Sequence, residues 1–449
     1  MMIGGLAYFF PFKIKEGKKF FLEWSGVFLI LISYVFISQE NLWPGYLAFI
    51  PVFGTFLVIQ AQRENSLLTN NFIFQRLGAW SYSIYLWHWP LVVSMYYFSF
   101  DNSFVYFGIA LSVLLGFLSY KYVEKRNFRK SFSSPMGYLK YKPLLMVVLI
   151  GGMGSTVYLN DGMEIRLPSE VAIAAQEETN KNPHKCMTDQ DVYEGLNPCF
   201  IGNKNSIKAI IVGDSHADAV TTALAGAFDL NLDGILALTK ASCPFIVGIK
   251  STLHENVCLL ENKDRIKFLE EKYDGIPVFW VARTGAYFFG QSSTDRSAAH
   301  EDKAPTIYFT NIYATPEEDL FSEFKAMLNI TVGKVAENHP IYLVLPTPEM
   351  RQNVPKTLAK NILLGREKKD ISIAYELYAE RNNLIRGLLE DVAKSENVNV
   401  LDPIPYLCFE GRCIAQYQNR PIYYDDDHMS EYGNKLISPM FSQAMKKHL

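Results

Sequence analysis

The chain has 449 residues, enough for roughly two or three domains of about 100–200 residues each. Its formal net charge of −3 is close to neutral, which argues against a nucleic-acid partner. Apolar and aromatic residues are concentrated in the first third of the chain, and mixed, charged sequence fills the rest. This asymmetry predicts a membrane part joined to a soluble part.

Five apolar stretches in the first third are long enough to cross a bilayer core, which takes about 20 residues. They run over Phe20–Ser38, Trp43–Gln62, Trp80–Ser99, Phe104–Tyr120 and Pro143–Leu159. Lysine and arginine are concentrated in alternate connections, at Lys13–Lys19, at Arg63 and Arg76, and within Glu124–Lys142. The positive-inside rule therefore places those connections in the cytoplasm and everything after Asn160 outside it.

The cysteines support an exported part, because all of them follow the last predicted span. They are Cys186, Cys199, Cys243, Cys258, Cys408 and Cys413. An even number in this part of the chain suits an oxidising compartment. Sequence neighbours suggest the pairs Cys186–Cys199, Cys243–Cys258 and Cys408–Cys413. A zinc site is the alternative, and it is the weaker one because no C-x-x-C or H-x-x-x-H spacing occurs, so we expect no metal.

From about Ile207, short apolar runs alternate with amphipathic segments. The runs are Ile207–Gly213, Asp233–Thr239, Gly275–Ala282, Pro340–Pro346 and Asn397–Ile404. Continuous apolar runs are typical of strands buried on both faces, and their alternation with helical patterns predicts an α/β domain with a parallel sheet. Ligands bind such sheets at the carboxyl ends of the strands.

One such end carries the sequence GDSH, Gly213–His216. Gly213 permits a tight turn, and Ser215 falls in the first turn of the next helix, where free N–H groups favour developing negative charge. A serine nucleophile needs that environment, because attack on an ester creates an oxyanion. The alternative is that Asp214 or Ser215 only caps the helix. His216 points away from Ser215 and is expected to be structural or to face substrate.

Near the carboxyl terminus, the sequence YYDDDHMSEYGN places Asp425 three residues before His428. A neutral imidazole can take the proton of a serine, and a carboxylate can hold the ring in the required tautomer. Asp426 and Asp427 are the alternative acids, or they form a solvated acidic turn.

The GDSH sequence after a first strand, together with D-x-x-H near the carboxyl terminus, resembles the SGNH family of esterases and acyltransferases over about Ile207–Leu449. The resemblance implies a flavodoxin-like sheet and a triad of Ser215, His428 and Asp425. The family's G-x-N-D block is not visible, and Val278–Tyr287 stands in its place. The candidate oxyanion donors are therefore the N–H of Ser215, the side chain of Arg283 and the backbone amides of Lys240–Phe245. The alternative for Arg283 is an exposed or salt-bridged arginine.

The membrane part carries two unusual polar residues. His88 lies inside the third predicted span, in SYSIYLWHWP, and Glu124 lies in YKYVEKRNFR after the fourth. These stretches resemble the later helices of the acyltransferase-3 family. A histidine within a span usually faces an interior or a cavity, and the alternatives are an interfacial position for His88 and a structural role for both residues.

Family members with an appended SGNH domain O-acetylate surface polysaccharides such as the O-antigen of lipopolysaccharide. The resemblance thus implies an O-acetyltransferase of the bacterial inner membrane with its C-terminal domain in the periplasm. It also implies acetyl-CoA as donor to the membrane domain, a polysaccharide acceptor and no bound cofactor. The early family helices are not seen, so we expect a truncated chain or a separately supplied membrane half. The alternatives are a membrane-anchored carbohydrate esterase, an inactive remnant and a glycan-binding anchor.

The predicted organisation is an α-helical transmembrane bundle followed by an SGNH-type α/β domain. Residues 1–160 form the transmembrane part, residues 161–205 a periplasmic linking extension that packs on the sheet domain, and residues 206–449 the α/β domain.

Overall fold

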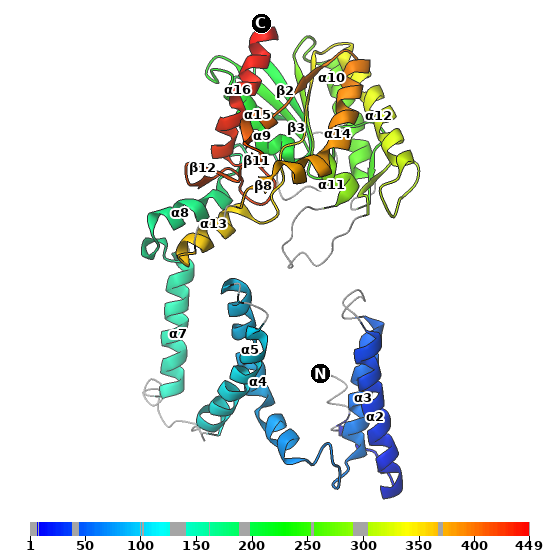
Figure 1. Ribbon diagram of the computed structural model, residues 1–449, viewed down its shortest axis with the longest axis vertical. Helices are drawn as coiled ribbons and strands as arrows, with labels where there is room; N and C mark the ends of the chain where they lie inside the picture. Colours follow the sequence, from blue (N-terminus) through cyan, green and yellow to red (C-terminus); the bar gives the residue numbers. More distant parts are fainter. Residues whose placement is uncertain are drawn as a thin grey trace. The chain divides into compact units, whose positions relative to one another are not determined.

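A computed structural model describes residues 7, 9–37, 45–98, 100, 103–125, 141–160, 162–187, 198–252, 256–290, 304–366 and 371–448. The chain forms two compact units, Met1–Val147 and Val148–Leu449 (Figure 1). Most of the predicted basic connection Glu124–Lys142 lies outside the described residues.

Each of the five predicted spans coincides with a helix. The helices are α2 (Glu16–Phe36), α3 (Phe49–Ala61), α4 (Phe72–Phe98), α5 (Phe104–Ser119) and α7 (Lys142–Leu159). A 3₁₀ turn, η1 (Tyr46–Ala48), precedes α3, and a π-helical turn, η2 (Tyr120–Glu124), continues α5.

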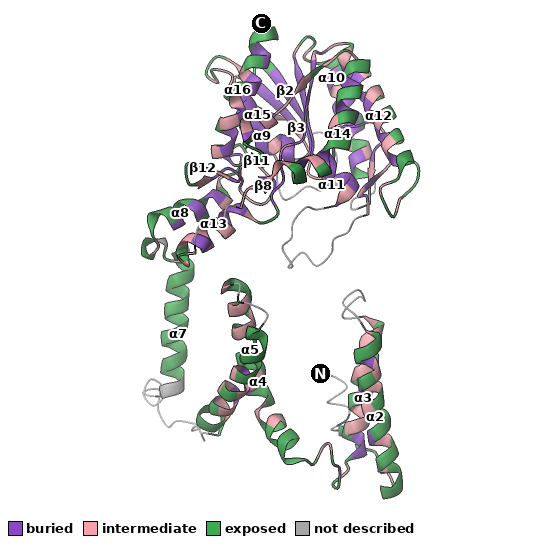
Figure 2. Ribbon diagram, in the orientation of Figure 1, coloured by how far each residue is buried: buried purple, intermediate pink, exposed green. Residues whose placement is uncertain are grey.

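Two of these helices, Glu16–Phe36 and Phe104–Glu124, are long and apolar enough to cross a membrane, and two shorter apolar helices cover Tyr46–Ala61 and Leu144–Leu159. Exposed residues, coloured green in Figure 2, occur along all of them. In α7, for example, Val147, Ile150 and Met153 are 67 %, 64 % and 71 % exposed. Apolar surface of this extent is unusual in water and compatible with lipid.

Small residues and one buried acid hold the α2–α3 pair together. A Cβ atom at Gly54 would lie 2.7 Å from the carbonyl oxygen of Gly26, so the two backbones approach as closely as glycine allows. Glu23 of α2 is buried and accepts hydrogen bonds from Arg63 at 2.9 Å and from Ser66. The acid is thus paired, as a buried charge must be.

The second unit contains the predicted sheet. Its strands are β1 (Cys199–Gly202), β2 (Ile207–Gly213), β3 (Gly234–Thr239), β5 (Val278–Val281), β7 (Ile341–Val344) and β9 (Asn399–Leu401), in the order β1-β3-β2-β5-β7-β9. All pairs are parallel except β1 with β3. The five predicted strands are confirmed. The edge strand β1 was not predicted, because an edge strand needs no long apolar run, and it comes from the segment assigned to the linking extension.

Helices cover both faces of the sheet (Figure 1). One face packs against α9 (Ser215–Ala225) and α16 (Glu431–His448), and the other against α10 (Val257–Glu271), α12 (Glu318–Ala336) and α14 (Tyr375–Ser395). Successive strand residues alternate between these two cores: Ile210 and Val212 join the α12 side, and Ala209 and Ile211 the α9 side. Two buried faces explain the continuous apolar runs in the sequence.

Short elements complete the unit. They are α8 (Ser169–Gln176), α11 (Thr284–Phe289), α13 (Val354–Leu363), α15 (Ile404–Leu407), η3 (Glu164–Arg166), η4 (Glu177–Thr179), β4 (Lys250–Ser251), β6 (Ile307–Tyr308), β8 (Ile373–Ala374), β10 (Cys408–Phe409), β11 (Arg412–Cys413), β12 (Gln416–Tyr417) and β13 (Arg420–Pro421).

All three predicted disulfides are present. Cys186–Cys199 ties the linking extension to β1, Cys243–Cys258 ties the loop after β3 to α10, and Cys408–Cys413 closes the β10–β11 hairpin. No cysteine is left over as a metal ligand among them.

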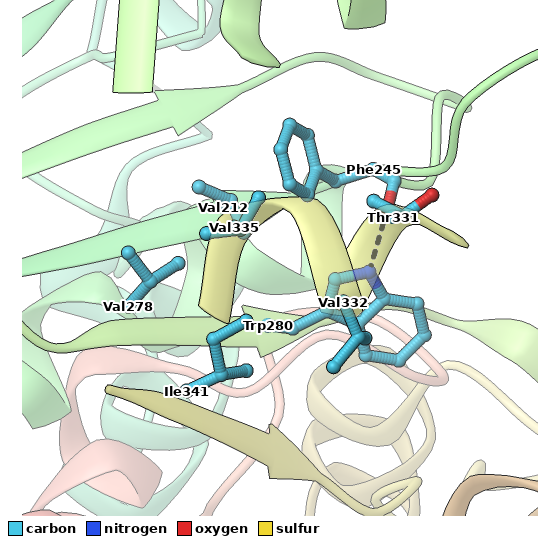
Figure 3. A pocket seen from close by; sticks show the side chains of 8 residues that line it. All are labelled: Val212, Phe245, Val278, Trp280, Thr331, Val332, Val335 and Ile341. Carbon is cyan, nitrogen blue, oxygen red and sulfur yellow. Dashed lines mark hydrogen bonds between the residues drawn. The ribbon is translucent and has the colours of Figure 1, made fainter. Parts of the chain in front are cut away.

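A small cavity lies in the core between the sheet and α12 (Figure 3). Its lining residues are Val212, Phe245, Val278, Trp280, Thr331, Val332, Val335 and Ile341. The Trp280 indole N–H donates to the Phe245 carbonyl at 2.9 Å, which satisfies its one polar atom. The cavity is an apolar packing gap and contains none of the predicted site residues.

β2 ends in a turn that only glycine can make. Gly213 has φ +149°, and a Cβ atom there would overlap the carbonyl oxygen of Val281 on the neighbouring strand. The glycine therefore sets the direction in which the chain enters α9.

We predict that Gly213→Ala lowers the free energy of unfolding by about 3 kcal/mol or more, because the methyl group must displace β5 or the turn. The matched control is Gly387→Ala in α14, where nothing lies within 4 Å of the added methyl and alanine favours the helix by about 1 kcal/mol. Urea unfolding of the two variants in detergent measures the difference, and equal midpoints would contradict the prediction.

Candidate active site

The helix cap and the predicted nucleophile are different residues. The Asp214 carboxylate caps α9 by accepting the backbone N–H of His216 at 2.8 Å. Ser215 is the first residue of the helix, and its Oγ contacts a side chain from another part of the chain instead. The capping alternative therefore holds for Asp214 and leaves the serine hydroxyl available.

The structure brings the three predicted triad residues together. Nε2 of His428 lies 2.8 Å from Oγ of Ser215, across 213 positions of sequence, and Nδ1 of the same ring lies 2.9 Å from Oδ2 of Asp425. The other oxygen of Asp425 accepts the backbone N–H groups of Asp427 and His428 at 2.9 and 2.8 Å, which fixes the loop. In this geometry, the imidazole can take the serine proton while Asp425 holds its Nδ1–H.

A second carboxylate also reaches the histidine. Oδ1 of Asp427 lies 2.6 Å from Nδ1 of His428, and Asp427 is only 2 % exposed. The alternative of a solvated acidic turn is therefore wrong for Asp427, which faces inward.

Arg283 does not occupy the position expected for an oxyanion donor. Its guanidinium pairs with Glu349 at 2.6 Å and with Asp427, both nearly fully buried. These contacts place its charge on the carboxylate side of His428. Arg283 is therefore the salt-bridged arginine that the sequence left as its alternative. The sequence did not name the partners, because neither Glu349 nor Asp427 is near Arg283 in sequence.

The charges around His428 stabilise its protonated form and the ionised form of Asp427. Burial alone would lower the pKa of His428, but hydrogen bonds to Asp425 and Asp427 outweigh it and raise that pKa to about 10. Burial alone would raise the pKa of Asp427, but His216, His428 and Arg283 hold it well below its usual range. The imidazolium that forms when the serine loses its proton is thus strongly favoured.

Asp214 also joins two turns at the carboxyl edge of the sheet. Its Oδ2 accepts the backbone N–H of Arg283 at 2.8 Å and the hydroxyl of Tyr287 at 2.6 Å. Sequence reasoning missed this role of Asp214 and Tyr287. The available signal was that both segments follow strands of the same sheet.

The remaining oxyanion candidates lie beside the serine's strand. The Lys240 N–H donates to the Gly213 carbonyl at 3.1 Å, so the loop after β3 starts next to the β2 turn. Cys243 of this loop is in a disulfide with Cys258. The Ser215 N–H and the amides of this loop stay predictions as oxyanion donors.

The linking extension reaches the neighbourhood of the triad. Asn182 donates to the side chain of Asp218 on α9 at 3.1 Å. The Nζ of Lys181 lies 4.9 Å from the centre of the Tyr424 ring, which itself stacks on His428 at 5.2 Å. The extension therefore does more than join two parts, since it packs against the residues that flank the general base.

The other predicted polar residues take separate positions. His216 is buried and its ring lies 4.4 Å from that of His428, which agrees with a structural role. In the first unit, His88 is exposed on α4, and Glu124 accepts a hydrogen bond from Ser83 of the same helix. This bond ties the π-helical turn to α4, the structural role left open for Glu124.

We predict that Tyr287→Phe slows covalent labelling of Ser215 by a fluorophosphonate about 10-fold, because Asp214 loses a hydrogen bond worth about 1.5 kcal/mol or more. Tyr342→Phe is the matched control, since its hydroxyl makes only a 3.4 Å contact with the Ala444 carbonyl. Labelling rates of intact protein measure both, and equal rates for the two variants would show that Asp214 needs only its backbone donors.

Comparisons with known proteins give a similar solved structure and a family match. The periplasmic domain of a lipopolysaccharide acetyltransferase from Salmonella ser. Paratyphi A is similar at 17 % identity and a TM-score of 0.39, covering 54 % of this chain and 85 % of that domain. No curated protein matches significantly. A family model for the SGNH domain fused to AT3 domains matches residues 185–443. Because this match spans more than half of the 449 residues, the chain belongs to that SGNH-domain family.

Proposed function

We propose that the protein is an O-acyltransferase that acetylates a cell-surface polysaccharide through an acyl-enzyme on Ser215. The observation that carries the proposal is the 2.8 Å contact of Ser215 Oγ with His428 Nε2, with Asp425 on the opposite nitrogen. Membership of the SGNH-domain family supports an acyl-transfer or ester-cleaving function.

The reaction has two steps. Ser215 Oγ attacks the acyl carbonyl, its proton passes to His428 Nε2, and the leaving group departs with that proton. A sugar hydroxyl then attacks the serine ester and gives its proton to His428. The bond between Ser215 Oγ and the acyl carbon breaks, His428 returns the proton to Ser215 Oγ, and the acylated sugar leaves. Transfer instead of hydrolysis requires that the acceptor exclude water from the ester.

The exposed apolar helices support a membrane location, and the three disulfides support an oxidising compartment for the second unit. We therefore place residues 1–160 in the bacterial inner membrane as a multi-pass part, and residues 161–205 and 206–449 in the periplasm. Acetyl-CoA is the proposed source of the acetyl group. The membrane part would carry the acetyl group across the membrane to Ser215.

A membrane-anchored carbohydrate esterase would use the same residues. The full chain in detergent, given an acetyl-ester donor, distinguishes the two: a transferase forms an acetylated glycan when the acceptor is saturating. Release of acetate alone, with saturating acceptor, would support the esterase and contradict the transferase.

We predict that Ser215→Ala abolishes fluorophosphonate labelling and lowers acyl transfer by about 10⁴-fold or more, because the covalent route is lost. Ser395→Ala is the control, since this serine lies at the end of α14 and bonds Asn329. Failure of the parent chain to label, with its disulfides intact, would instead favour an inactive remnant or a glycan-binding anchor.

A further inference from the structure

Two carboxylates compete for one proton at His428. The Nδ1 nitrogen of His428 carries a single hydrogen. Oδ2 of Asp425 lies 2.9 Å from this nitrogen, and Oδ1 of Asp427 lies 2.6 Å from it. Asp425 is aligned as a hydrogen-bond acceptor. Asp427 is closer but not aligned, and within the described part of the chain its Oδ1 has no hydrogen bond of good geometry. A small rotation of the imidazole would exchange the two partners.

Asp427 is held in place more firmly than Asp425. Its side chain is 3 % exposed, against 28 % for Asp425. The guanidinium of Arg283 pairs with both Asp427 and Glu349. Glu349 also accepts a hydrogen bond from Arg381 at 3.3 Å. Burying the charge of Asp427 is costly, and these ion pairs offset that cost. The position of Asp427 beside His428 is therefore fixed by specific contacts.

We propose that Asp427, fixed by Arg283 and Glu349, is a second positioning residue for His428, so that two acids orient the general base in turn. The inference rests on the proposed roles of Ser215 and His428. Asp425 accepts Nδ1–H in the state described, and Asp427 accepts it when the ring turns.

The exchange gives the ring two stable orientations. His428 must serve both the serine oxygen and the oxygen of the leaving group or the acceptor, which occupy different positions around Nε2. A ring that turns from Asp425 to Asp427 keeps its tautomer, because either carboxylate holds the Nδ1 proton. His216 borders this movement, since its ring lies 4.4 Å from that of His428 and its Nε2 is 3.7 Å from Asp427.

The test measures the rate of Ser215 labelling against pH, which depends on neutral His428 and needs no acceptor glycan. The ionisable groups that face His428 are Asp425, Asp427, His216, Tyr424 and Asp218, with Arg283 acting through Asp427. Neutral imidazole appears as pH rises, so the labelling rate rises with pH, and a lower pKa moves the midpoint of that rise to lower pH.

We expect Asp427→Asn to lower the midpoint by about one to two pH units, because it removes one nearby negative charge. Asp425→Asn should leave the midpoint above about 6.5, the ordinary value for histidine, and slow labelling only about 10- to 100-fold, since Asp427 still accepts Nδ1–H. The double variant should lose about 10⁴-fold, as when the sole orienting acid of a triad is removed. Asp426→Asn, the middle carboxylate of the same triplet, is the matched control and should shift the midpoint by less than half as much.

Two results would overturn the proposal. One is an unchanged midpoint for Asp427→Asn, which would make that residue purely structural even if the rate falls. The other is a 10⁴-fold loss in Asp425→Asn alone with a midpoint near 6.5, and this result is decisive even if Asp427→Asn does not fold. Neither depends on transfer to a polysaccharide, so a failed acceptor assay leaves the outcome readable.

Discussion

The carboxylate of Asp214 is the contact on which the candidate site depends. One oxygen caps α9 through the N–H of His216, and the other accepts the N–H of Arg283 and the hydroxyl of Tyr287. A single acid thus fixes both the helix that begins with Ser215 and the turn after β5. Because Gly213 lets β2 and β5 approach closely, these two turns meet at one edge of the sheet.

A second set of charges lies on the Nδ1 side of His428. Glu349 and Asp427 are buried on either side of Arg283, and each would be costly alone. The positive charge of Arg283 stabilises both acids. Asp427 brings negative charge to Nδ1 of His428, which Asp425 contacts from the more exposed side. The general base therefore depends on residues from the turn after β5, the loop after β7 and the carboxyl-terminal loop at once.

The linking extension joins the site to the rest of the chain. Its disulfide from Cys186 to Cys199 anchors it to the edge strand, and Lys181 covers the ring of Tyr424 beside His428. Through its described residues the extension packs beside the general base, so a change there should alter the surroundings of His428.

Local patterns predicted the parallel strands, the helical stretches and the disulfide pairs, and the resemblance to the SGNH family implied the grouping of Ser215, His428 and Asp425. These features depend on runs of apolar residues and on short spacings between polar residues, and both can be seen directly in the sequence. Only the tertiary structure revealed the edge strand β1, the hydrogen bond from Tyr287 to Asp214, and the pairing of Arg283 with Asp427 and Glu349. The physical reason is that burial of a charge is determined by neighbours that are distant in sequence, and no periodicity or motif encodes which of them will meet.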